Sequence, residues 1–140
     1  TNLKGTFYCC KYAIPAMLEH GGGSIVNISS MSGVRGVAYS VPSAVSKAGV
    51  IHLTKVAAAQ YTHQGVRVNC IAPGGIDTPQ MRGSTASAET FQERNVEHPM
   101  GRVGRPDEVA NLITWLTSEE ASYVSGSTYI IDGGAWALAT

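Results

Sequence analysis

The chain has 140 residues, with ten basic and ten acidic side chains and a formal net charge of zero. This length predicts one domain over residues 1–140. The neutral balance argues against binding to nucleic acid or to a membrane surface, since both need a basic excess. A hydrophobic content of 44% excludes a disordered chain, and a charged content of only 14% suggests that another surface covers part of this one.

The first predicted element is an amphipathic helix, because apolar residues recur at three- and four-residue steps over residues 3–18. Pro15 lies inside it and is expected to kink it. Gly21–Gly23 end the helix. A short buried strand is predicted over Ser24–Ser29, followed by a loop over Ser30–Tyr39 that is rich in serine and glycine.

A second helix is predicted from about Ser43 to Thr62. Pro42 suits its first turn, and Val41 should be extended because it precedes a proline. The helix is apolar on more than one face, which fits packing on a sheet and on a partner helix. A strand over Val66–Ile71 and a loop over residues 72–75 follow.

The C-terminal third contains a polar helical segment over Ala86–Glu97, a helix that opens at Pro106 and a last strand over Ser127–Ile131. Helices and strands therefore alternate along the whole chain. This order predicts the α/β class with a mostly parallel sheet.

Cysteine and histidine usage indicates neither a disulfide framework nor a metal site. Three cysteines are an odd number, and Cys9, Cys10 and Cys70 form no CxxC pair. We expect reduced, buried thiols in a cytoplasmic protein. The four histidines lack metal-ligand spacing, and we interpret them as ordinary surface or packing residues. No apolar stretch approaches the roughly 20 residues that span a membrane.

Three polar elements are expected at the carboxyl edge of the sheet, where enzymes of this class bind ligands. Ser30 follows the first strand. Ser43 and Lys47 lie four residues apart on one helical face. The Pro73–Thr78 loop follows the second strand; its glycines let backbone amides approach a ligand, and Thr78 can donate from its hydroxyl.

The sequence resembles the C-terminal half or more of a short-chain dehydrogenase/reductase, over essentially all 140 residues. The matching segments are TNLKGTF at residues 1–7, IVNISS at 25–30, RVNCIAPG at 67–74, PMGRVGRP at 99–106 and IDGG at 131–134. The resemblance implies a Rossmann-like doubly wound parallel sheet, represented here by its C-terminal portion, with the N-terminal dinucleotide-binding half absent. It also implies an NAD(P)-dependent oxidoreductase that interconverts an alcohol and a carbonyl in a small-molecule substrate.

The family's catalytic roles transfer to four positions of this sequence. By resemblance, Asn2 holds a water on the proton-relay path, Ser30 holds the substrate oxygen, and Lys47 binds the nicotinamide ribose. The family's tyrosine belongs at the position of Ser43. The implied cofactor-binding residues are Lys47, Pro73, Gly74, Gly75, Ile76 and Thr78, with Ile76 acting through its backbone. The family also associates as dimers or tetramers through helices that correspond to residues 2–19 and 43–62, and through the last strand region.

Ser43 is the main departure from the family pattern, which is YxxxK. A phenol has a pKa near 10 that an adjacent cation can lower, whereas an aliphatic hydroxyl is far less acidic. Ser43 is therefore a poor acid or base and also reaches less far. Tyr39 is a poor substitute, since Pro42 and the preceding loop separate it from the Lys47 face. We expect an impaired enzyme, whether the serine is natural or engineered.

Alternatives to an active oxidoreductase stay open. The second hypothesis is an inactive binding or scaffold protein of this fold, or a truncated fragment of an enzyme. A serine hydrolase using Ser43 with Lys47 is a third hypothesis, because SxxxK occurs in acyl-transfer enzymes. The choice between NAD and NADP is not readable, since the residue that makes it lies in the absent half.

Overall fold

A computed structural model describes residues 2–36, 40–83 and 98–138. The helices are α1 (Asn2–Glu19), α2 (Met31–Val34), α3 (Val41–Tyr61), α4 (Pro79–Gly83) and α6 (Pro106–Thr117). The strands are β1 (Gly23–Ile28), β2 (Val66–Pro73) and β3 (Thr128–Ile131). Short 3-10 helices are η1 (Thr62–Gln64), η2 (Glu119–Ala121) and η3 (Ala135–Leu138). The predicted segment Ala86–Glu97 lies outside the described residues.

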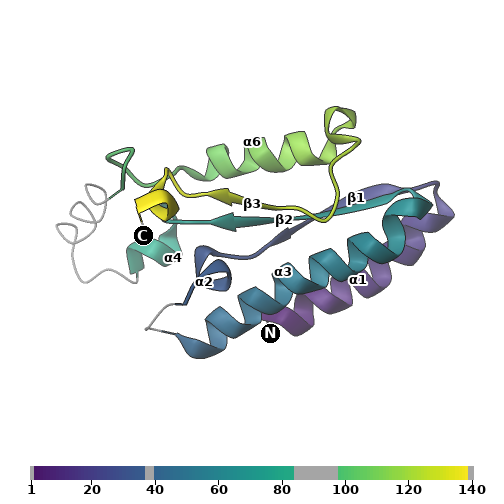
Figure 1. Cartoon of the computed structure of the whole chain (residues 1–140), viewed down its shortest axis with the longest axis horizontal. Coiled ribbons are helices and arrows are strands. Elements are labelled where there is room, and N and C mark those ends of the chain that lie inside the picture. Colours follow the sequence, from purple (N-terminus) through teal and green to yellow (C-terminus); the bar gives the residue numbers. More distant parts are fainter. Residues whose placement is uncertain (1, 37–39, 84–97, 139–140) are drawn as a thin grey trace.

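The three strands form one parallel sheet in the order β1-β2-β3. The register pairs Gly23 with Val66 at the start of β1, and Pro73 with Ile131 at the end of β3. Helices α1 and α3 cover one face of the sheet and α6 covers the other (Figure 1). The predicted α/β class with a parallel sheet is therefore confirmed for the described part of the chain.

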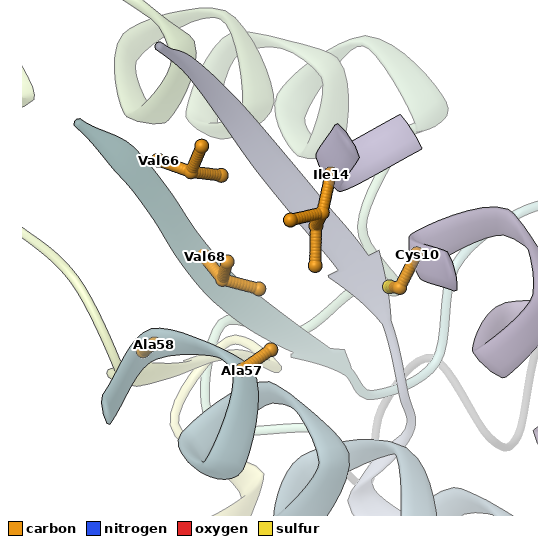
Figure 2. Close-up of a cluster of buried hydrophobic side chains, with 6 residues drawn as sticks. All are labelled: Cys10, Ile14, Ala57, Ala58, Val66 and Val68. Atoms are coloured by element: carbon orange, nitrogen blue, oxygen red, sulfur yellow. The ribbon is translucent and has the colours of Figure 1, made fainter. Parts of the chain in front are cut away.

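The core lies between β2 and the two long helices. Figure 2 shows its buried side chains, which come from α1, α3 and β2: Cys10, Ile14, Ala57, Ala58, Val66 and Val68. Small alanines on α3 let that helix lie close to the branched valines of β2. The side chains of α1 then close the cluster from the other side, so packing fixes both helices on the sheet.

A buried polar contact links α1, β1 and α3. The Asn27 side chain donates from Nδ2 to Thr54 Oγ1 at 2.9 Å, and its Oδ1 accepts from the thiol of Cys10 at 3.7 Å. Thr54 Oγ1 in turn donates to the carbonyl of Val50 at 3.0 Å. Because these buried groups are all partnered, they pin the three elements together without an unpaired polar atom.

Two features of the long helices concern their prolines, Pro15 in α1 and Pro42 in α3. Pro15 is accommodated inside α1, which continues to Glu19, and its side chain is exposed. Helix α3 begins at Val41 rather than Ser43, and the expected extended conformation at Val41 is wrong. The N–H groups in the first turn of a helix have no intrahelical partner, so Pro42 loses no hydrogen bond there. Helix α3 can therefore begin at Val41, one residue before Pro42.

The predicted loop after β1 contains a helix instead. Ser30 adopts an extended conformation and caps the four-residue α2, accepting from the backbone N–H of Ser32 at 3.2 Å. Gly33 brings α2 against α3, since a Cβ at this position would lie 2.6 Å from the carbonyl carbon of Lys47. Tertiary packing therefore stabilises a helix too short to be read from periodicity. Tyr39 lies outside the described residues.

The cysteines fit the prediction in part. All three are free thiols; Cys10 and Cys70 are buried, but Cys9 is exposed on α1, so the prediction of burial is wrong for Cys9. Burial raises the pKa of the Cys10 and Cys70 thiols, which keeps them protonated.

Within the described residues, no helix is both long and apolar enough to cross a membrane, and no cluster of potential metal ligands occurs.

Candidate functional site

The carboxyl ends of the strands open into a cleft of about 710 Å³. In Figure 1 the strand arrows point toward the end of the molecule at which α2, α4 and η3 gather. The sequence-predicted residues that line this cleft are Ser30, Ser43, Lys47, Pro73, Gly74, Gly75, Ile76 and Thr78. Eight residues from three separate segments, chosen on sequence grounds, therefore face one space.

Ser30 reaches the cleft because β1 ends two residues before it. The neighbouring Ser29 is buried and donates from Oγ to the carbonyl of Lys47 at 2.8 Å, which ties the strand end to α3. The Ser30 hydroxyl oxygen accepts from Ser32, so its own proton is available to a ligand. The position of this donor is thus fixed by a strand end, a cap and a buried hydrogen bond.

Lys47 projects from α3 toward the end of β1. Its ammonium donates to the carbonyl of Ile28 at 3.1 Å. An ammonium has three N–H donors, so two remain for other acceptors in the cleft. No side-chain hydrogen bond joins the Lys47 ammonium to the Ser43 hydroxyl in the structure, and the Ser43 carbonyl accepts from the hydroxyl of Ser46 at 2.8 Å.

The 73–78 loop is shaped by the segment around Gly104. Gly104 donates to the carbonyl of Gly75 at 2.9 Å and accepts from the amide of Asp77 at 2.8 Å. This pattern is a parallel bridge between Ile76 and Gly104. In such a bridge the amide and carbonyl of the central residue point away from the partner strand. The N–H and C=O of Ile76 accordingly have no backbone partner in the described part of the chain.

Both ends of this loop are anchored. Gly74 donates to the carbonyl of Ile131 at 3.0 Å, and a Cβ there would lie 2.6 Å from Asp132 Cβ, so only glycine allows this approach to the end of β3. At the other end, Thr78 Oγ1 accepts from the amide of Met81 and starts α4. Arg82 donates twice to the Asp77 carboxylate, at 2.6 Å for each bond. This guanidinium lowers the pKa of Asp77.

Asn2 is the one predicted site residue that does not line the cleft. It borders a neighbouring open hollow of about 790 Å³ between the first turns of α1 and α3. Its side-chain amide is 3.5 Å from the hydroxyl of Ser46, to which it donates. Ser43 lines both spaces, so Asn2 lies on the far side of Ser43 from the cleft.

Sequence reasoning missed two basic side chains in the cleft. His98, which we interpreted as an ordinary packing residue, lines it, and His98 Nε2 would lie 2.9 Å from a Cβ on Gly75. Arg35, in the predicted loop, lines it as well. Arg35 could have been found from its position, because it follows Ser30 by five residues. His98 had no local signal in the sequence, because it reaches Gly75 only through tertiary packing.

Similar proteins are numerous. A family model described as "Enoyl-(Acyl carrier protein) reductase" matches residues 1–135. The 2-keto-3-deoxy-L-fuconate dehydrogenase of Xanthomonas campestris is 45% identical over 140 residues, which cover 95% of this chain and 46% of that protein. A cyclohexanol dehydrogenase of an Acinetobacter strain is 42% identical over 133 residues, 94% of this chain and 51% of its own length. A Bradyrhizobium diazoefficiens protein described as "Probable short-chain type dehydrogenase/reductase" is 42% identical over 135 residues, 96% of this chain and 47% of its own.

Solved structures agree with the sequence relatives. Levodione reductase superposes with a TM-score of 0.93 at 35% identity, covering 98% of this chain and 55% of that one. ElxO with NADP bound gives a TM-score of 0.90 at 37% identity, covering 98% and 56%. The chain thus spans about half the length of the proteins that it matches. With the parallel sheet, the cleft at its carboxyl edge and these relatives together, the chain belongs to the short-chain dehydrogenase/reductase family.

Proposed function

We propose that the chain carries the catalytic side of an oxidoreductase that interconverts an alcohol and a carbonyl with NAD or NADP. One observation supports this most: Ser30, Ser43, Lys47 and the 73–78 loop line a single cleft at the carboxyl edge of the sheet. That edge is where doubly wound sheets bind their ligands. The family relatives named above are dehydrogenases and reductases.

The residues present suit a nicotinamide nucleotide. A carboxamide needs one acceptor and one donor, and Ile76 offers an amide and a carbonyl that lack backbone partners in the described residues. The Thr78 hydroxyl proton and two N–H donors of Lys47 supply further bonds, the latter to ribose hydroxyls. When bound, this cofactor supplies or accepts the hydride. Pro73, Gly74 and Gly75 hold the loop that presents these groups.

Ser30 is proposed to hold the substrate oxygen. Its hydroxyl proton is available because the oxygen already accepts from the amide of Ser32. A donor fixed in this way stabilises negative charge as it develops on the oxygen. Asn2 is proposed to hold a relay water. It donates to Ser46 and lies on the side of the cleft that Ser43 lines.

Ser43 is proposed to limit the reaction. A general acid works best when its pKa lies near the working pH, and an aliphatic hydroxyl is far from it. The second half of the reaction, proton transfer at oxygen, is therefore slow while Ser43 stands at this position. The same observation favours the alternative of a cofactor-binding scaffold without turnover. The hydrolase hypothesis loses support, because Lys47 contacts Ile28 and not Ser43.

We also propose that two copies associate through α1 and α3. Both helices expose large apolar side chains away from the sheet, notably Phe7 and Tyr12 on α1 and Val45 and Val56 on α3. A hollow of about 230 Å³ between the helices includes Phe7 and Val56. Light scattering tests this as a dimer or tetramer; a monomer at micromolar concentration contradicts it. The cytoplasmic location stays a prediction.

Cofactor binding to the intact protein tests the proposed site. Lys47→Met should weaken binding of NADH or NADPH by roughly 10–100-fold, since hydrogen bonds from a charged donor contribute about 1.5–3 kcal/mol each. Lys55→Met is the matched control, because Lys55 is exposed on the same helix and does not line the cleft. Equal affinity in both variants contradicts the site. Tight binding without turnover on a panel of secondary alcohols, even with Ser43→Tyr, supports the scaffold instead.

A further inference from the structure

Arg35 is a cation at the substrate end of the cleft to which the proposed reaction gives no role. It follows α2, and its backbone amide donates to the carbonyl of Met31 at 3.0 Å, which ends that helix. The residue lines the same cleft as Ser30 and Ser43. Its backbone position is thus set by the short helix that Ser30 caps.

The C-terminal segment positions the Arg35 guanidinium. Its central carbon lies 6.0 Å from the centre of the Trp136 ring. Trp136 is held in turn by Asp132, whose carboxylate accepts from the amide of Trp136 at 2.6 Å and from that of Gly134 at 3.0 Å. Stacking over a ring orients a guanidinium while leaving its N–H donors available.

Arg35 has no acidic partner in the described part of the chain. Arg82, Arg102 and Arg105 each pair with a carboxylate, and Arg67 donates to backbone carbonyls. For Arg35, the ring of Trp136 is the contact that the structure gives. An arginine that is held in place but not neutralised is suited to bind an external anion.

The charged residues that line the cleft also favour an anionic ligand. Among its described lining residues, Arg35, Lys47 and His98 are basic, and none is aspartate or glutamate. Lys47 already contacts Ile28 and is proposed to bind ribose, and His98 lies against Gly75 in the proposed cofactor loop. Arg35 is therefore the basic side chain left for the substrate. A lining that carries basic side chains and no acidic one favours anionic over neutral ligands.

We propose that Arg35 binds a carboxylate of the substrate and makes this site selective for small hydroxy or oxo acids. The inference rests on the proposed oxidoreductase function and specifies its substrate class. A guanidinium and a carboxylate match in a planar, two-bond arrangement, which fixes the direction of the substrate as well as its charge. The bound acid would then present its alcohol or carbonyl carbon to Ser30.

Binding of a matched ligand pair to the intact protein tests the proposal. The probes are 4-oxopentanoate and its neutral amide, 4-oxopentanamide, titrated while the indole N–H signals of the chain's two tryptophans are followed by NMR. Neither tryptophan lines the cleft, but the Trp136 ring contacts Arg35, whereas Trp115 packs against Tyr129. The acid should shift the Trp136 signal saturably and bind at least about tenfold tighter than the amide.

Two variants complete the test. Arg35→Gln should abolish the preference for the acid, and Lys55→Gln, which removes an equal charge outside the cleft, should keep it. Equal binding of acid and amide, an acid preference that survives Arg35→Gln, or a shift at Trp115 alone would each overturn the proposal. Analogous sulfonate and phosphate ketones distinguish carboxylate recognition from general anion binding; tighter binding of either overturns the carboxylate assignment.

Failure of this inference differs from failure of the proposed function. Cofactor titration and turnover are measured on the same samples. Cofactor binding that depends on Lys47 without an acid preference removes the Arg35 assignment alone. An acid preference that depends on Arg35, in a protein with neither Lys47-dependent cofactor binding nor turnover with Ser43→Tyr, removes the oxidoreductase and leaves an acid-binding site.

Discussion

The two ends of the central strand β2 differ sharply in their surroundings. Its first six residues include Val66, Val68 and Ile71, which have no solvent-exposed surface, while Pro73 at its end opens into the cleft. Helix α3 repeats the contrast, with Ala57 in the core and Lys47 in the cleft. The packed core and the proposed site thus lie at opposite ends of the same two elements, which gives the proposed site a rigid base.

This separation predicts that substitutions at the two ends affect different measurements. A change in the packed half should lower the free energy of unfolding and spare the intrinsic ligand affinity of the folded protein. A change at the cleft should do the reverse. The tests below proceed from the largest expected effect to the smallest.

Ile71→Ala should have the largest effect on stability. The side chain is fully buried, so its loss should lower the free energy of unfolding by about 2–5 kcal/mol, measured by urea denaturation. Ile130→Ala is the control on the neighbouring strand, where 38% of the residue is exposed, and it should cost much less. Equal losses would mean that β2 is not the centre of the core.

Ser30→Ala should affect catalysis far more than folding. Loss of one fixed donor to a developing oxyanion lowers kcat by about 10²–10³, measured here in the Ser43→Tyr background. The loss of the α2 cap should cost only about 1 kcal/mol of stability. Ser32→Ala is the control on the same short helix. If both variants lower kcat equally, α2 merely supports the site and Ser30 does not touch the substrate.

Gly33→Ala should change both measurements, because this glycine lies where α2 meets α3. Its Cβ would lie 2.6 Å from the Lys47 carbonyl carbon, so the backbone must shift at a cost of about 1–3 kcal/mol. The same shift moves Ser30 relative to Lys47 and should weaken ligand binding. Gly36→Ala is the control, since a Cβ there meets open space. Unchanged stability and binding in Gly33→Ala would contradict the close approach.

The smallest effect concerns acid stability at Glu108, beside the cleft. Two bonds from Arg102 lower the pKa of Glu108 from its usual value to about 2. A lowered pKa stabilises the fold above pH about 4.5, and this stabilisation disappears as the pH falls toward 2. The stability difference between wild type and Glu108→Gln should therefore be constant above pH 5 and shrink below it.

Glutamine can still accept from the amide of Arg105 at the start of α6, so this comparison removes the charge and one acceptor for Arg102 while keeping the cap. Glu120→Gln is the control, because Glu120 is exposed and forms no ion pair among the described residues. A difference that stays constant from pH 6 to 3 would mean that the Arg102 pair does not stabilise the fold.

Sequence reasoning succeeded where one segment carries its own signal. The apolar steps of α1, the run of branched residues in β2 and the Pro106 start of α6 each reflect a local period or cap. The candidate site residues were found differently: their positions at strand ends indicated the edge of the sheet, and the family resemblance suggested roles for Ser30 and Lys47 that stay proposals.

Sequence reasoning failed where a contact between segments far apart in the sequence determines the local structure or the position of a side chain. Helix α2 exists because Gly33 meets α3, and no four-residue window reveals that contact. Arg35 gains its significance from Trp136, which lies far along the chain. His98 reaches Gly75 only in the fold. Such pairs depend on tertiary packing, which a single sequence does not display.

The central claim is that this cleft is a redox site limited by Ser43. The most direct test replaces Ser43 with tyrosine in the intact protein and measures kcat with a nicotinamide cofactor and a panel of alcohols, with Ser43→Phe as the control for size. We predict a rise in kcat of about 10²–10⁴ for Ser43→Tyr and none for Ser43→Phe. A protein that binds cofactor yet shows no rise with tyrosine, or an equal rise with phenylalanine, would contradict the account.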